Sequence, residues 1–186
     1  MIVRQLPLLT GIFGFNQNTS KMKKLLLLLV TCFALTANAQ SKKECQDLLE
    51  AEKHVAENIK IYTAVWDKIF NGRDIEQVNE KNFATDVLLL NQKETVRAQG
   101  IEGFKKAFNS YLLQFSDIKF TFIDVWGHGD KLVKHWNFQG KHNKTGNPMN
   151  LSGVTLVKMK DGKIIEEQDF DDNLWYNQQL GNYLVK

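Results

Sequence analysis

The sequence predicts one α+β domain in which helices come first and an antiparallel sheet follows. Apolar residues recur at steps of three and four between Glu44 and Phe70, and again after Gly100, which is the period of an amphipathic helix. After Asp117 the period changes to two, as in a strand with one buried face. The helical stripes need an apolar surface to pack against, so we expect the helices to cover one face of a curved sheet.

Two long helices are predicted from these stripes. The first stripe ends at Asn71-Gly72, a helix stop signal, and consists of Leu48, Ala51, Val55, Ile59, Tyr62, Trp66, Ile69 and Phe70. A shorter helix is predicted with Asp74 as its N-cap and Phe83 near its end, followed by a strand over residues 86–92. Gly100 introduces the second long helix, whose stripe consists of Ile101, Phe104, Phe108, Tyr111, Leu112 and Phe115.

The second half of the chain predicts four strands and a last short helix. The strands cover residues 118–126, 132–140, 151–160 and 163–171, and the helix covers 173–180. The last two strands meet at Asp161-Gly162, a dipeptide typical of a type I′ hairpin turn. In the first strand, Phe120, Phe122 and Trp126 are predicted to share the core face, which Asp124 interrupts.

Residues 1–39 are predicted to be an upstream extension plus a secretory signal peptide, and residues 40–186 the single domain. Met22-Lys-Lys is followed by a short apolar run and then by Ala37-Asn-Ala39, which predicts a start at Met22 and cleavage after Ala39. We therefore expect export to the periplasm or the cell exterior, with no stable membrane span in the mature chain. The alternative interpretation of the same segment is a retained amphipathic anchor.

The charge of the predicted mature chain argues against nucleic-acid binding. The whole chain has 24 basic and 21 acidic residues, but Arg4, Lys21, Lys23 and Lys24 lie in the leader, so 20 basic and 21 acidic residues remain. Only Cys45 remains as well, which excludes an internal disulfide. The histidines show no metal-ligand spacing, and there is no phosphate-binding glycine loop, so we expect neither a metal nor a cofactor.

The chain resembles the SnoaL-like members of the nuclear transport factor 2-like superfamily from about Ile59 to Gly181. The resemblance is carried by residues 62–72, 129–133 and 136–142, and most strongly by the closing run 161–174 with 178–181. It implies a cone, in which a strongly curved sheet wraps over the helices and encloses an apolar pocket. It also implies that the aspartate on the strand after the Asp-Gly turn, Asp169, acts as acid and base without a cofactor, as in the polyketide cyclases of this family.

Two positions depart from the cyclase pattern. Glu167-Gln168 stands where those cyclases have His-Trp, and the preceding strand offers the small residues Gly153 and Thr155. The sequence does not decide which face of the strand Asp169 occupies. Strand alternation that turns Asp169 inward turns Phe170 outward, whereas hydrophobicity favours the opposite register. A β-bulge would reconcile the two.

The binding wall is predicted to consist of Tyr62, Trp66, His135 and Trp136, whose rings suit a small, partly apolar carbonyl compound. The hypothesis is a cyclase- or isomerase-type enzyme with Asp169 as its acid/base, because general acid/base catalysis beside a carbonyl needs one well-placed carboxyl group. The alternatives are a non-catalytic domain that binds a small hydrophobic ligand and a dimerisation module. The resemblance also implies a homodimer formed through the sheet, as in many relatives.

Overall fold

The computed structural model describes residues 19–182, and their side chains from residue 42 onward. The chain divides into two compact units, residues 1–47 and 48–186. The described part of the first unit is helical and belongs to α1 (Thr19–Phe70), a helix that begins well before the predicted Glu44 and ends at the predicted residue. Residues 1–18 of the predicted leader lie outside the described residues.

The predicted signal peptide stays a prediction. Among the residues whose side chains are described, 42–182, no helix is long and apolar enough to cross a membrane. The mass of the chain isolated after secretion tests the prediction: cleavage after Ala39 gives a product that begins at Gln40. A mature chain that retains residues 22–39 would favour the anchor instead.

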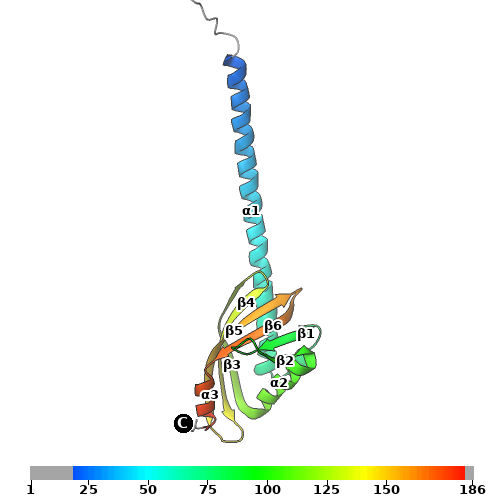
Figure 1. The fold of residues 1–186 in the computed structure, drawn as a ribbon, viewed down its shortest axis with the longest axis vertical. Helices are drawn as coiled ribbons and strands as arrows, with labels where there is room; N and C mark the ends of the chain where they lie inside the picture. The colour runs from blue at the N-terminus through cyan, green and yellow to red at the C-terminus, as the bar shows by residue number, and fades with distance from the viewer. Residues whose placement is uncertain (1–18, 183–186) are drawn as a thin grey trace, which may run out of the picture. The chain divides into compact units, whose positions relative to one another are not determined.

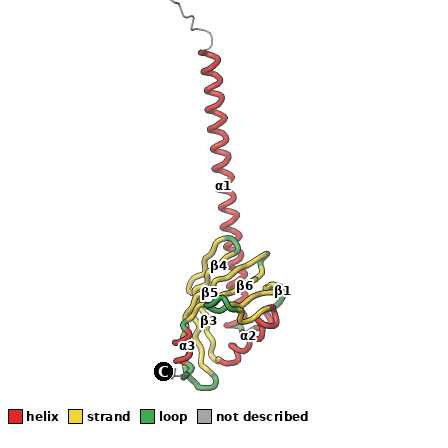
Figure 2. The backbone as a smooth tube through the Cα atoms, in the orientation of Figure 1, coloured by secondary structure: helices red, strands yellow, loops and turns green. Residues whose placement is uncertain are grey.

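The second unit is an α+β domain, as predicted, built on one curved six-stranded sheet (Figure 1). The strand order is β2-β1-β6-β5-β4-β3, and every neighbouring pair is antiparallel except β1 and β6. The strands are β1 (Phe83–Leu90), β2 (Val96–Gln99), β3 (Phe115–His128), β4 (Lys131–His142), β5 (Pro148–Lys160) and β6 (Lys163–Asp171). The helices besides α1 are α2 (Gly100–Gln114) and α3 (Asn173–Gln179), and Figure 2 shows where they join the strands.

The prediction of a helix from Asp74 to about Phe83 is wrong. Asp74 does cap a helical segment, because its side chain accepts a hydrogen bond from the backbone N–H of Glu76 at 3.1 Å. That segment is a single 3₁₀ turn, η1 (Ile75–Gln77), since the amide of Asn82 then binds the carbonyl of Gln77 at 2.8 Å. Asparagine side chains that bind nearby backbone groups in this way compete with helix formation. Phe83 consequently begins β1 rather than ending a helix.

The core fills the concave face of the sheet and is strongly aromatic. Tyr62, Trp66 and Ile69 of α1 and Phe104 of α2 are fully buried. The ring of Phe70 stacks on that of Phe120 in β3 with the centroids 4.5 Å apart. The two helical stripes thus cover one face of the sheet, as their spacing predicts.

A bulge in β6 settles the open question about its faces. Met159 of β5 pairs with Ile164, but the preceding Lys158 pairs with Glu166, so Ile165 is one extra residue on β6. The extra residue lets the strand bury Ile164 on the core face and then place Glu167 on that same face. Both sequence-based registers are therefore partly right, each on its own side of the bulge.

A second bulge, in β3, corrects a predicted core position. Phe122 pairs with Trp136 of β4, whereas Asp124 pairs with the next residue back, His135, so Ile123 is the extra residue. After Ile123, the even-numbered residues of β3 lie on the convex face instead of the core face. Trp126 accordingly has 59% of its surface exposed. Asp124 is also exposed, which explains how an acid can stand in an otherwise apolar pattern.

Candidate functional site

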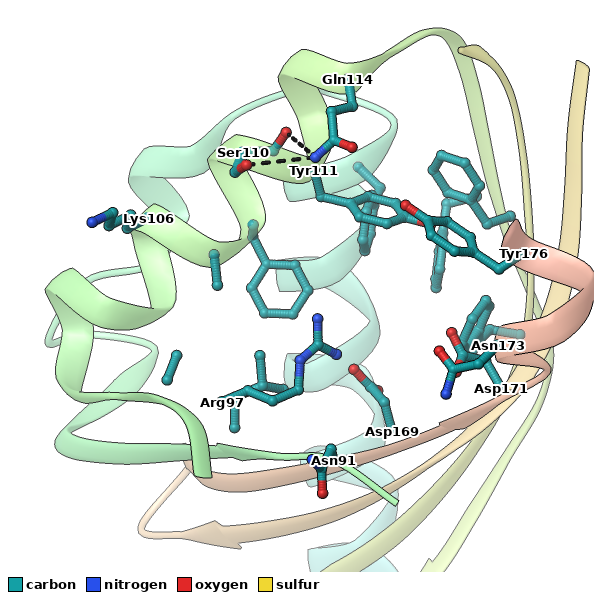
Figure 3. Close-up of a pocket in the computed structure, with 18 of the residues that line it drawn as sticks. Asn91, Arg97, Lys106, Ser110, Tyr111, Gln114, Asp169, Asp171, Asn173 and Tyr176 are labelled. Atoms are coloured by element: carbon teal, nitrogen blue, oxygen red, sulfur yellow. Dashed lines mark hydrogen bonds between the residues drawn. The ribbon is translucent and has the colours of Figure 1, made fainter. Parts of the chain in front are cut away.

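The concave face of the sheet encloses a cavity of about 850 Å³ that opens between α2, α3 and the ends of the strands (Figure 3). Apolar rings from α1, α2 and β3–β4 form much of its wall. Five charged side chains also line it, three cations and two carboxylates: Arg97, Lys106, Lys134, Asp169 and Asp171. A cavity of this volume is in the range of small-molecule sites, roughly 300–1,000 Å³.

Asp169 lines the cavity and is held by a hydrogen-bond relay. Thr155 on β5 pairs with Asp169 across the sheet, and its hydroxyl donates to the Asp169 carboxylate at 2.7 Å. The indole N–H of Trp136 in turn donates to the Thr155 hydroxyl at 3.0 Å. Figure 3 shows the Asp169 carboxylate directed into the cavity, near Arg97. The relay fixes one oxygen of the carboxylate and leaves the group facing the space that a ligand would fill.

Gly153, one of the two departures from the cyclase pattern, makes room for Trp136. A Cβ at position 153 would lie 2.4 Å from the indole ring of Trp136 and 2.7 Å from the carbonyl oxygen of Phe170. The indole therefore lies over β5 only because this residue has no side chain. Gly153 thus leaves room for the indole that donates to Thr155, and Thr155 donates to Asp169.

Glu167, the other departure, is buried beneath the cavity. Its side chain is 1% exposed, and its Oε1 accepts hydrogen bonds from the Tyr62 hydroxyl and from the Trp66 indole N–H, the latter at 2.8 Å. Its Oε2 has no hydrogen-bond partner within the described part of the chain. Burial raises the pKa of Glu167 to about 7, against the opposing effect of the Lys134 ammonium. The same burial, together with Glu167 itself, raises the pKa of Tyr62 well above its ordinary value.

Lys134 is a site residue that the sequence analysis missed. It is 3% exposed and lines the cavity from the concave face of β4. Its ammonium lies 4.8 Å from the ring centroid of Trp66, 5.3 Å from that of Tyr62 and 5.5 Å from that of Phe120. Contacts of this kind stabilise a cation through the negative faces of the rings. The signal was present, because Lys134 falls in the same alternation as Leu132, Trp136 and Phe138, all of which are buried.

A second charged group lies near Asp169. Asp171 lines the cavity two residues further along β6, and burial raises the pKa of Asp171, with the Asp169 carboxylate adding to the rise and Arg97 opposing it. Tyr111 of α2 and Tyr176 of α3 face each other with ring centroids 6.3 Å apart, and both line the cavity (Figure 3). The lining thus combines aromatic surface with charges of both signs.

The structure brings together only part of the predicted site. Asp169 and Trp136 line the cavity. Tyr62 and Trp66 do not form its wall as predicted, because they are fully buried behind it and hold Glu167. His135 is exposed on the opposite face of β4, so we remove it from the candidate site. Among the described residues, no group of three or more His, Cys, Asp or Glu side chains is arranged to hold a metal ion.

Comparison with known proteins identifies relatives of this fold. The family described as SnoaL-like polyketide cyclase matches residues 56–180. The structure of TsrD from Streptomyces laurentii is similar, with a TM-score of 0.59 and 20% identity over 68% of this chain and 96% of that one. A protein from Acidithiobacillus ferrooxidans that is thought to be a polyketide cyclase gives a TM-score of 0.60 and 21% identity, over 67% of this chain and 94% of that one. The structure of TerC co-crystallised with polyporic acid gives a TM-score of 0.57 and 18% identity, over 67% of this chain and 98% of that one. Comparison with curated proteins gives no significant match.

The buried carboxyl group of Glu167 predicts a pH-dependent stability. The pKa of Glu167 is raised from 4.5 to about 7 in the folded protein, so the folded state keeps a proton that the unfolded chain has released. The unfolded chain binds fewer protons over this interval, and the free energy of unfolding therefore falls as pH rises from 4.5 to about 7. The loss amounts to about 3 kcal/mol, and no further loss from this group occurs above that range.

Glu167→Gln should abolish this contribution while keeping an acceptor oxygen for Tyr62 and Trp66. Urea unfolding at several pH values on either side of neutrality measures the effect as the difference between variant and wild type. Glu166→Gln is the matched control, because Glu166 lies on the opposite face and pairs with Lys158 at 2.8 Å. Equal pH dependence in the wild type and Glu167→Gln would contradict the assignment.

Proposed function

Because the chain belongs to the family of SnoaL-like polyketide cyclases, we propose that it binds a small carbonyl compound in its cavity and that Asp169 transfers a proton to or from that compound. The observation that carries the proposal is the orientation of Asp169, which faces the cavity and is held there by Thr155. The reaction type is a cofactor-independent cyclisation or isomerisation.

The surroundings of Asp169 suit a general base. A base must reach the proton that it removes, and a carboxylate directed into a cavity of about 850 Å³ meets this requirement. The aromatic lining excludes water from an apolar ligand and strengthens electrostatic effects inside the site. Proton transfer by a positioned side chain contributes on the order of 10²- to 10⁴-fold in rate. Since the carboxyl group alone accepts and returns the proton, this chemistry requires neither a nucleotide nor a metal.

A similar structure supports ligand binding in this fold. TerC was co-crystallised with polyporic acid, and its similarity to this chain extends over 98% of the TerC chain. For this chain the corresponding support is its own cavity, which combines aromatic walls with a few charged groups.

A non-catalytic binding domain is the second candidate, and the departure at Glu167-Gln168 favours it. Neither residue is available to a ligand, because Glu167 is enclosed by Tyr62 and Trp66 and Gln168 donates to the backbone carbonyl of Asn91 at 3.1 Å. The His-Trp pair of the cyclases therefore has no counterpart here that faces the cavity. In such a domain Asp169 would orient a ligand without exchanging its protons.

Replacement of Asp169 separates the two candidates. The assay follows hydrogen–deuterium exchange next to the carbonyl group in a panel of bicyclic aryl ketones and diketones, in D₂O, by NMR. The enzyme should accelerate exchange in at least one ketone, and Asp169→Asn should reduce the acceleration by about 10²-fold or more while the affinity for the ketone stays within a few-fold. Asp124→Asn is the control, because Asp124 is an exposed aspartate on the other face of the sheet.

The contrary outcomes are distinct. Exchange that Asp169→Asn leaves unchanged would exclude Asp169 as the base. Ketones that bind without any exchange would favour the binding domain.

We also propose that the domain forms a homodimer through the convex face of its sheet. Large apolar side chains of β3, β5 and β6 lie on this face with substantial exposure: Trp126 59%, Leu156 44% and Phe170 36%. Cross-strand pairing places Trp126 and Leu156 in one row on either side of Val133, and Phe170 pairs with Val154 in the neighbouring row. Exposed apolar patches of this kind mark interaction surfaces in soluble proteins.

Leu156→Lys should convert the dimer to a monomer, because two buried ammonium groups would face each other at the interface. Analytical ultracentrifugation measures the change. Leu113→Lys is the matched control, since Leu113 is 66% exposed but belongs to α2. A wild-type protein that sediments as a monomer, or a Leu156→Lys dimer, would contradict the proposal.

A further inference from the structure

The cavity contains a buried cation for which the described residues supply no acceptor. Lys134 is 3% exposed and lines the cavity, and its ammonium contacts the three rings of Tyr62, Trp66 and Phe120. Among the described residues, no hydrogen bond or ion pair to this ammonium is found, although an ammonium has three N–H donors. Removal of a charged group from water is expensive unless it is paired. The aromatic contacts offset part of this cost and leave the donors unused.

The neighbouring carboxylates do not serve as its partners. Glu167 is directed to Tyr62 and Trp66 by its hydrogen bonds, and Asp169 to Thr155. Neither forms an ion pair with Lys134. The remaining charged groups of the cavity are Asp171 and the two cations Arg97 and Lys106, so cations outnumber carboxylates on its lining. A ligand oxygen that bears negative charge would complete the coordination of Lys134.

Lys134 and Asp169 flank the same residue of the sheet. Lys134 pairs with Thr155 on one side, and Thr155 pairs with Asp169 on the other. Two interstrand spacings separate the backbones of Lys134 and Asp169 by about 10 Å. Both side chains line the same cavity, so one ligand can meet the carboxylate and the ammonium together.

We infer that Lys134 binds the carbonyl oxygen of the ligand and stabilises the negative charge that this oxygen acquires, so that the substrates are carbonyl compounds that react through an enolate or phenolate. The inference rests on the proposed proton transfer by Asp169. Asp169 takes the proton from the carbon next to the carbonyl. The electron pair of that C–H bond forms the new C=C bond, and the π pair of the carbonyl moves to oxygen, where the ammonium stabilises it. Return of the proton reverses these steps.

The inference also narrows the class of ligand. An apolar wall alone would accept any small hydrophobic compound, whereas a buried cation selects one with an ionisable or enolisable oxygen. A neutral isostere would leave the ammonium buried without an acceptor, and a site of this kind discriminates strongly against such analogues.

Two probes test Lys134: para-nitrophenol, which binds as a coloured phenolate if the site stabilises an oxyanion, and para-nitroanisole, its methyl ether, which cannot ionise. The wild-type protein should bind para-nitrophenol in the phenolate form at a pH where the free compound is mainly protonated, and more tightly than the ether. Lys134→Met, a substitution of similar shape, should lose about ten- to a hundredfold in affinity for the phenolate and little for the ether. Lys131→Met is the matched control, because Lys131 is an exposed lysine of the same strand that does not line the cavity, and its replacement should leave the preference unchanged.

Three results would overturn the inference. They are a bound para-nitrophenol that stays protonated in the wild type, equal wild-type affinities for the two probes, or a phenolate preference that Lys134→Met retains. Binding of the ether to Lys134→Met shows that the cavity is intact, and the wild-type spectrum does not depend on any variant. Asp169→Asn separates this inference from the proposed function: it should abolish deuterium exchange but keep the phenolate preference, so either can fail while the other stands.

Discussion

The burial of Glu167 and Lys134 among aromatic rings is the constraint on which the rest of the site depends. A carboxyl group and an ammonium group lie inside a core that would otherwise be apolar, and among the described residues neither has a partner for every polar atom. Tyr62 and Trp66 make this possible because each offers a polar hydrogen to Glu167 and a π face to Lys134. The first helix therefore does more than fill the concave face of the sheet. It fixes the position of the charges under the cavity, and Lys134 keeps its donors because Glu167 is occupied by these two rings.

The bulge at Ile165 decides which acids share this face. Without the extra residue, a strand that buries Ile164 would direct Phe170 inward and Asp169 to solvent. With it, Ile164 packs in the core, and Glu167, Asp169 and Asp171 follow on the concave side. One inserted residue thus allows a strand to seal the core at one end and present acids to a cavity at the other. Bulges are often found beside active sites for this reason.

The sequence predicted the elements better than their faces. The stripe that ends at Phe70, the Asp161-Gly162 hairpin and the fold class are confirmed, because helical period, strand period and turn chemistry are local properties of the chain. The outward position of Trp126 was not predictable, since a bulge in β3 depends on pairing with β4. The exposure of His135 was predictable from alternation within β4, because His135 is adjacent to the inward-facing Trp136 and the two cannot line the same face of a regular strand. Lys134 was missed because lysine in a strand is ordinarily exposed, and the rings that enclose it come from helix α1 and from β3.

Glu167 and Asp169 carry the same functional group, but they differ in their access to the cavity. Glu167 is enclosed by Tyr62 and Trp66, so it can affect a ligand only through its charge and through Lys134. Asp169, one inward position further along, meets the cavity and has a single neutral donor, the Thr155 hydroxyl, on one of its oxygens. Among the described residues, its second oxygen has no hydrogen-bond partner, and Figure 3 shows the carboxylate directed into the cavity near Arg97. Glu167 also has an oxygen without a hydrogen-bond partner among the described residues, but that oxygen is buried, whereas a carboxylate that accepts a proton from a ligand must reach the ligand. This difference in surroundings, rather than in residue type, is the reason to assign proton transfer to Asp169 and not to Glu167.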